Sequence, residues 1–98
     1  MNALTKVSDI TAADVAEYLR VGDASELVTI GNLLTVAKDF ISGYTGLSAA
    51  EIDTHKEFII AVFVLCEDMY DNRTLYVDNE NLNKVVDTIL GMYAVNLL

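Results

Sequence analysis

The most informative hydrophobic pattern in this chain is an unbroken apolar run in its second half. Phe58 to Cys66 are nine consecutive apolar residues, and a largely polar segment, residues 67–73, follows them. An apolar run of this length must be covered on nearly every side, as in a helix at the centre of a small protein. The pattern therefore predicts a central helix over residues 54–72, surrounded by the rest of the chain.

Elsewhere, apolar residues recur at steps of three and four, which is the spacing of one helix face. The clearest stripe begins near Asp23 or Ser25 and consists of Leu27, Ile30, Leu34, Ala37, Ile41 and Tyr44. A second stripe predicts a last helix from about residue 81 to the C-terminus, with Leu82, Val85, Val86, Ile89, Leu90, Tyr93 and Leu97 on its apolar side. A shorter helix is predicted over residues 11–21.

Capping signals indicate where these helices begin and end. Three pairs of residues have the spacing of a capping box: Thr11 with Asp14, Ser48 with Glu51, and Thr54 with Glu57. Gly22 is expected to end the first helix, and Gly46 is expected to end the second. The polar, turn-rich residues 74–81 are predicted to form a loop, in which residues 75–77 either extend briefly as a strand or pack as irregular chain.

Length and composition make these helices one domain. The 98 residues contain no proline, five glycines and no low-complexity tract, so nothing divides the chain. We therefore predict an all-α fold: a single-domain bundle of about four to five helices over residues 1–98, built around the helix at 54–72, with a loop at 74–81. Residues 1–8 are expected to be flexible.

The balance of charge and apolar residues indicates the kind of partner. Fifteen acidic residues outnumber six basic ones, and the basic residues are scattered singly, which argues against gripping phosphates but suits a surface that DNA slides past. The apolar content of 53% exceeds what one compact monomer of this size needs, so we expect part of it to be buried against a partner. Neither a signal-peptide core nor a run long enough to span a membrane is present, so no membrane partner is expected.

Little in the sequence points to catalysis. The single histidine, His55, would lie three helical turns from the single cysteine, Cys66, which is expected to pack as a small hydrophobic residue. No glycine-rich phosphate loop and no metal-spaced Cys or His cluster is present. The acids Glu67, Asp68 and Asp71 fit a solvated acidic face better than a calcium site. We therefore predict no enzymatic activity, no cofactor and no bound metal.

Arg73 stands out among the charged residues because it falls at the end of the central helix. Its charge suits the helix dipole there, and Tyr70 lies one turn before it, close enough for the guanidinium to stack on the ring. Two interpretations remain open. Arg73 either caps the last carbonyls of the helix or fixes the following loop by bonding to a carboxylate, for which the candidates are Asp9, Asp14 and Glu51.

Several short motifs occur in an order that resembles the phage gp6-like head–tail connector family. The first is an opening of Ile-Thr, acid-Val and Tyr-Leu-Arg within residues 9–21, and the second is a helix at 33–41 closed by Tyr-Thr-Gly at 44–46. The third is a Tyr-x-Asn-Arg signature, formed by Tyr70, Asn72 and Arg73. The chain departs from the family after residue 73, where a proline is usual, and at the end of the last helix, where a basic residue is usual.

The resemblance implies a non-enzymatic virion protein. It would form a homo-oligomeric ring beneath the portal of a tailed phage or prophage, contact the next head-completion or tail protein, and let DNA pass through without binding it. Its place would be the head–tail junction, and the host cytoplasm during assembly. The candidate subunit or portal interface is Leu75, Tyr76, Val77, Leu82 and Tyr93. The candidate channel-facing acids are Glu67, Asp68 and Asp71.

A second function fits the acidic composition. An acidic helical module can occupy a DNA-binding protein by presenting carboxylates in place of phosphates. Such a mimic requires a surface array of acids, whereas the carboxylates here are spread through amphipathic helices. The connector interpretation is therefore preferred, and the regulatory or DNA-mimic module is its alternative.

Overall fold

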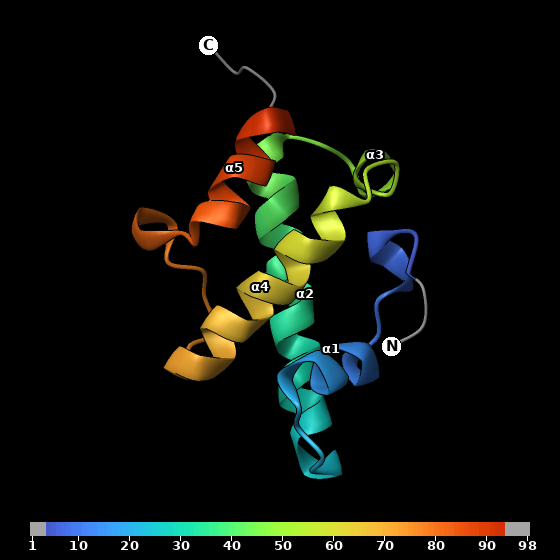
Figure 1. The fold of residues 1–98 in the computed structure, drawn as a ribbon, viewed down its shortest axis with the longest axis vertical. Helices are drawn as coiled ribbons and strands as arrows, with labels where there is room; N and C mark the ends of the chain where they lie inside the picture. Colours follow the sequence, from blue (N-terminus) through green and yellow to red (C-terminus); the bar gives the residue numbers. More distant parts are fainter. Residues whose placement is uncertain (1–3, 94–98) are drawn as a thin grey trace.

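The computed structural model describes residues 4–93, and within this range the chain is helical and contains no strand (Figure 1). The elements are the short 3-10 helix η1 (Val7–Asp9), α1 (Ala12–Leu19), η2 (Ala24–Glu26), α2 (Leu27–Thr45), α3 (Ala49–Ile52), α4 (Glu57–Asn72), η3 (Asn79–Asn81) and α5 (Lys84–Tyr93). The predicted all-α bundle of four to five helices is confirmed.

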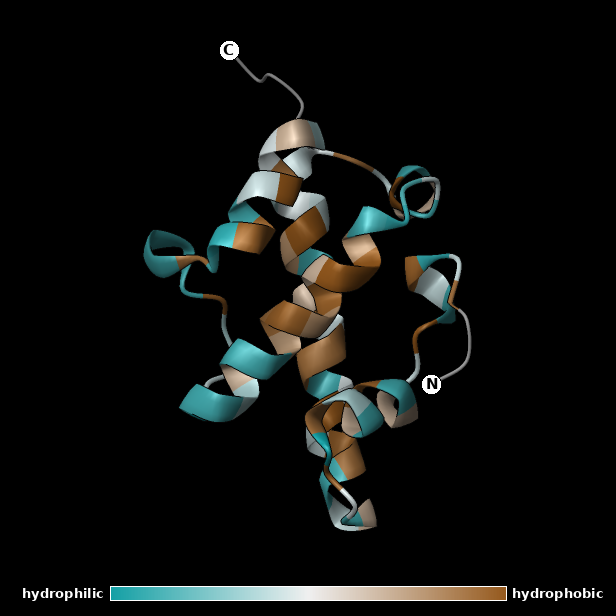
Figure 2. Cartoon of the chain, viewed as in Figure 1, coloured by the Kyte–Doolittle hydropathy of each residue, from teal (hydrophilic) through white to brown (hydrophobic). Residues whose placement is uncertain are grey.

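The apolar run forms α4, which crosses α2 at the centre of the molecule (Figure 1) and also packs against α1, α5 and η1. Phe58, Leu65 and Cys66 are almost completely buried. Figure 2 shows hydrophobic residues gathered where α2 and α4 cross, and hydrophilic residues at the end of α4. Ile60 is an exception to the predicted burial, since 54% of it is exposed on the outer side of α4.

The second long helix, α2, buries the stripe that its sequence predicts and ends at a defined point. Ile30, Ala37 and Ile41 are fully buried, whereas Leu27 at the start of the stripe is 36% exposed. Near the end of the helix the Thr45 hydroxyl is buried, and it donates to the Ile41 carbonyl at 2.7 Å. The chain then turns at the left-handed Gly46 (φ 76°), as predicted.

Two of the three predicted capping boxes are present. Thr11 with Asp14 and Ser48 with Glu51 each make both reciprocal hydrogen bonds. The third prediction was wrong, because the Thr54 hydroxyl donates to the Glu51 carbonyl at 2.6 Å and so belongs to the turn that ends α3. As a result, α4 begins after Lys56 without a side-chain cap.

The first helix ends near Arg20, as predicted, but the residue in the left-handed cap is Arg20 and not Gly22. Arg20 adopts a left-handed conformation (φ 60°) and its N–H donates to the Glu17 carbonyl at 3.1 Å. The Val21 N–H donates to the Ala16 carbonyl at 2.9 Å, which completes a Schellman motif. Ala16 is buried in the core and Val21 packs against that core, which favours a turn before the glycine.

Both ends of the described chain also differ from expectation. Val7 is only 5% exposed and Ser8 donates two hydrogen bonds to Asp53, so the expected flexible start does not extend to these residues. The last helix begins at Lys84, three residues later than predicted, because Asn81 is taken up by η3. The Asn83 side chain then accepts from the Val85 N–H at 2.8 Å. Leu97, assigned to the apolar side of this helix, lies outside the described residues.

The arginine at the end of α1 gives a first testable prediction. Replacing Arg20 by glycine removes the steric penalty of a left-handed side chain, so we expect Arg20→Gly to raise the free energy of unfolding by about 1 kcal/mol. Gly46→Ala is the matched opposite, because it introduces a side chain at a left-handed position and should lower that free energy by about 1 kcal/mol. Urea denaturation measures both, and a destabilised Arg20→Gly would show that the arginine side chain itself holds the turn.

Candidate functional site

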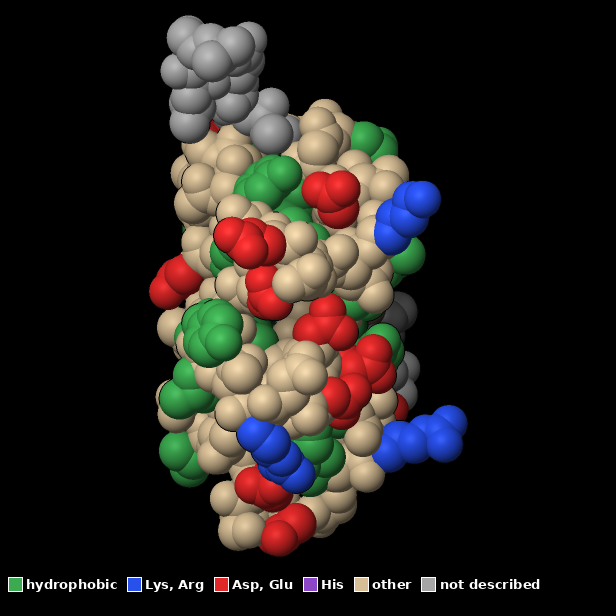
Figure 3. All heavy atoms as spheres, turned by 90° about the vertical axis from the view of Figure 1, so that its left-hand side faces the viewer, with side chains coloured by type: hydrophobic (Ala, Val, Ile, Leu, Met, Phe, Trp, Pro, Cys, Tyr) green, Lys and Arg blue, Asp and Glu red, His purple; other side chains and the backbone are tan. Residues whose placement is uncertain are grey.

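The end of α4, the loop at residues 74–83 and the start of α5 form the candidate site. The loop stands away from the helices on one side of the molecule (Figure 1). Figure 3 shows this side: acidic and hydrophobic side chains gather on it together, and basic side chains are sparse. This face therefore combines the two properties, acidity and exposed apolar surface, that the composition predicts for a partner surface.

The residues of the Tyr-x-Asn-Arg signature form the turn between the end of α4 and the loop. Arg73 is left-handed (φ 54°), its N–H donates to the Tyr70 carbonyl at 3.2 Å, and the Thr74 N–H donates to the Met69 carbonyl at 3.0 Å. This is the same Schellman geometry as at Arg20. The Asn72 side chain donates to the Asp68 carbonyl at 2.8 Å and so occupies another carbonyl in the last turn.

The two longer side chains of the signature converge on Glu26 of η2. The Tyr70 hydroxyl donates to Glu26 Oε1 at 3.1 Å, and Arg73 Nη1 lies 3.9 Å from the same oxygen. The guanidinium carbon of Arg73 lies 4.5 Å from the centre of the Tyr70 ring, in a cation–π arrangement. The predicted stacking is confirmed, but the predicted carboxylate partners Asp9, Asp14 and Glu51 were wrong, because the turn brings the end of α4 to η2 instead.

The three predicted channel acids lie on the same part of α4. Glu67 and Asp68 are half-buried and Asp71 is exposed. Burial raises the pKa of the Asp68 carboxyl, and the neighbouring Asp71 charge raises it further. The ring of Tyr18 of α1 lies 5.0 Å from that of Phe63 of α4. Burial, together with the charges of Glu67 and Asp68, raises the pKa of the Tyr18 hydroxyl. The acids therefore form one patch beside α1. Water only partly screens the repulsion between the carboxylates of this patch.

The predicted interface residues divide into two groups. Leu75 and Tyr76 are 60% and 64% exposed on the loop, which has no strand, and can contact another molecule. The others support the fold: Val77 and Leu82 pack against the core, and Tyr93 stacks on His55 with ring centres 4.2 Å apart and donates its hydroxyl to Glu57.

Two exposed residues of α5 are not among the predicted interface residues. Val85 and Met92 are 51% and 64% exposed, although Val85 was assigned to the apolar side of the last helix. They lie seven positions apart, so they share one face of α5. This spacing was available in the sequence, but the buried stripe beside it, formed by Val86, Ile89 and Leu90, obscured it.

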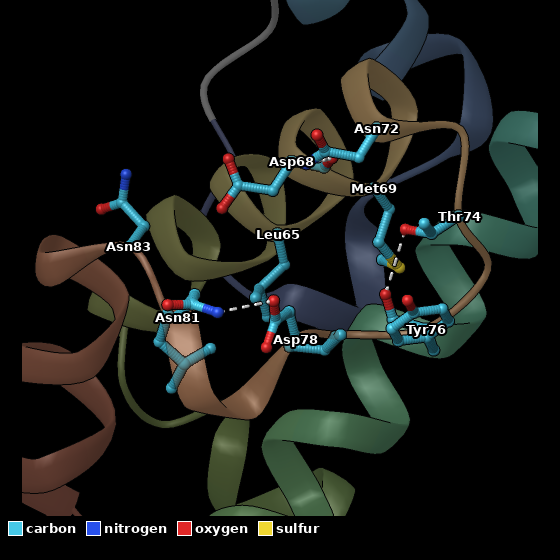
Figure 4. A pocket seen from close by; sticks show the side chains of 11 residues that line it. Leu65, Asp68, Met69, Asn72, Thr74, Tyr76, Asp78, Asn81 and Asn83 are labelled. Carbon is cyan, nitrogen blue, oxygen red and sulfur yellow. Dashed lines mark hydrogen bonds between the residues drawn. The ribbon is translucent and has the colours of Figure 1, made fainter.

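A cavity of about 520 Å³ lies between the loop and the end of α4. Figure 4 shows Asp68 and Asn72 of α4 on one side of it, and Asp78 and Asn81 of the loop on the other. The Asp78 carboxylate accepts from the Glu80 N–H at 3.2 Å and from the Asn81 side chain at 3.0 Å, which holds the loop around η3. No sequence pattern predicted this cavity.

The residues considered for catalysis are not arranged for it. Cys66 is fully buried, and burial raises the pKa of its thiol to about 12, which disfavours the thiolate. The His55 ring packs against Phe58 and Tyr93 at the other end of α4. Within residues 4–93, no three His, Cys, Asp or Glu side chains are grouped so as to hold a metal ion.

None of the helices described for residues 4–93 is both long enough and apolar enough to cross a membrane. Comparisons of the chain with protein-family models, with curated proteins and with solved structures gave no match. The function is therefore inferred from the residues and their arrangement.

The contact between Tyr70 and Glu26 can be tested by removing one hydroxyl. Tyr70→Phe loses the hydrogen bond but keeps the ring under Arg73, so we expect the free energy of unfolding to fall by about 1 kcal/mol. Tyr76→Phe is the matched control, since Tyr76 is exposed, and it should change stability by less than about 0.5 kcal/mol. Equal effects of the two substitutions in urea denaturation would show that the contact contributes nothing.

The raised pKa of Asp68 predicts a dependence of stability on pH. The folded protein holds this proton at pH values where the unfolded chain has lost it, so ionisation of Asp68 destabilises the fold above its folded pKa. Asp68→Asn should therefore raise the free energy of unfolding at pH 7. On acidification towards about pH 4, the free energy of unfolding should rise less in this variant than in the parent protein. Asp53→Asn should act in the opposite direction at pH 7, because the Ser8 hydroxyl lowers the pKa of Asp53. Unfolding measured at both pH values checks the two signs.

Proposed function

We propose that this protein is a head–tail connector of a tailed phage or prophage. It assembles as a homo-oligomeric ring that docks beneath the portal, contacts the next head-completion or tail protein, and leaves a channel for DNA. The observation that carries the proposal is the order of the family motifs, together with the role each has in the fold: the first forms α1, the second forms α2 with its Gly46 end, and the third forms the turn at Arg73.

Exposed apolar residues on the loop and on α5 support self-association. Leu75 and Tyr76 on the loop and Val85 and Met92 on α5 are each at least half exposed. The loop and α5 lie on the same side (Figure 1). In a ring with head-to-tail contacts, such a surface meets a different surface of the next subunit, and the contact closes by rotation. Burial of these side chains is then the main favourable contribution to assembly.

The acidic patch supports passage of DNA without adhesion. The chain carries a formal net charge of −9 and has no concentration of basic residues that could neutralise phosphates. Glu67, Asp68 and Asp71 lie together on α4, so a ring would repeat this patch in every subunit. If the patch lines the channel, repulsion keeps the DNA mobile.

The DNA-mimic module is the second candidate, and it is favoured by the gathering of acidic side chains seen in Figure 3. A mimic binds a basic, DNA-binding protein and ignores a portal. The apolar residues that lie among these acids fit a protein–protein contact in an assembly better than a mimic of a phosphate backbone, so this function ranks second.

Light scattering of the purified protein, alone and mixed with portal rings from the same phage or prophage, tests the connector role. We expect either a closed ring or a gain of mass that depends on the portal. Leu75→Asp should reduce assembly at least tenfold, because it places a charge in the proposed apolar contact. Val28→Asp is the matched control, since Val28 is 76% exposed on α2 and does not belong to the proposed contact surface.

The results separate the two functions. Loss of assembly with Leu75→Asp, but not with Val28→Asp, supports the proposed contact surface. A monomer that ignores the portal contradicts the connector role. If that monomer instead captures a DNA-binding protein, the mimic becomes the better explanation.

A further inference from the structure

The cavity under the loop has an apolar floor and a polar rim. Leu65 and Met69 are buried at its base, and Val77 and Leu82 line it from the loop side. Its volume of about 520 Å³ falls within the range of small-ligand sites in proteins. The loop that forms one wall of the cavity is held by its own hydrogen bonds, among them those of Asp78.

The rim has acceptors without a matching cation. Asp68 and Asp78 both line the cavity, and no lysine or arginine of residues 4–93 is among its lining residues. Asp78 is already engaged within the loop. In the part of the chain that the structure describes, by contrast, nothing donates a hydrogen bond to the Asp68 carboxylate or pairs with its charge. A half-buried carboxylate without a hydrogen-bond donor or a cation is less stable than one that is paired with a cation.

An apolar floor with an unpaired carboxylate on the rim favours one class of ligand. A lysine or arginine side chain has a long aliphatic stem that packs on apolar surface and a cationic head that pairs with a carboxylate. An inorganic cation would gain nothing from the apolar floor, and no group of three metal-binding side chains is present in residues 4–93. Phosphate groups of a nucleic acid are repelled by the acids on the rim.

We propose that the cavity between the 74–83 loop and the end of α4 binds a basic side chain presented by an extended segment of a partner protein. The stem lies against the partly exposed side chains of Val77 and Leu82, above the buried Leu65 and Met69. The cationic head pairs with Asp68, and the side-chain oxygens of Asn72 and Asn81 accept from its remaining N–H groups. This proposal stands apart from the connector role, because any partner with a suitably exposed basic residue can satisfy it.

A pair of peptides that differ only in charge tests the proposal on the full chain. The probe is a capped peptide Ser-Gly-Leu-Arg-Leu-Gly-Ser, and its control has citrulline, which is neutral and nearly the same shape, in place of arginine. Each is titrated to about 10 mM, well above a Kd of 1 mM, while methyl resonances of Leu65, Met69, Val77 and Leu82 are followed by NMR. We expect the arginine peptide to shift these resonances and the citrulline peptide to shift them at least tenfold more weakly.

Two variants locate the interaction. Asp68→Asn should weaken binding of the arginine peptide about tenfold or more. Asp9→Asn changes the net charge equally, but its element η1 lies on the opposite side of the molecule from the loop (Figure 1), so binding should be unchanged. The proposal is overturned if the arginine peptide gives no shift at these methyl groups, if both peptides bind equally, or if both variants weaken binding equally. It is also overturned if magnesium ions alone shift the same resonances and displace the peptide.

Discussion

Burial of the apolar run in α4 is the constraint on which the rest of the structure depends. A helix whose residues 58–66 are all apolar has no side that water favours, so α2, α1, α5 and η1 are placed where they cover it. The polar residues that follow mark the point along α4 where the neighbouring helices no longer cover it. The loop, the acidic patch and the cavity all lie at that boundary, because there the chain leaves the core but is still anchored to it by Met69 and Leu82.

Two arginines at left-handed positions give the molecule its sharp turns. At Arg20 and Arg73 the chain reverses through the same pair of backbone hydrogen bonds, where glycine is the usual residue. At Arg73 the side chain adds a second role, because it lies over Tyr70 and near Glu26. The direction of the loop therefore depends on η2, an element more than forty residues earlier in the sequence.

Local signals predicted much of this fold, whereas features that depend on distant contacts escaped prediction. The capping boxes at Thr11 and Ser48 and the turn at Gly46 involve neighbours in sequence, and all three are present. The carboxylate partner of Arg73 was mistaken because it depends on how α2 and α4 cross. The cavity was missed for the same reason: it arises from the separation between a loop and a helix, which no residue pattern encodes.

The complete burial of Cys66 has a practical consequence for anyone who works with this protein. It is the chain's single cysteine, and its thiol is shielded from solvent in the core. A cysteine introduced at an exposed position such as Tyr76 would react with a fluorophore or spin label far faster than Cys66, since reactivity follows access and thiolate content. The native sequence is therefore already a suitable background for site-specific labelling, without a substitution that would disturb the core.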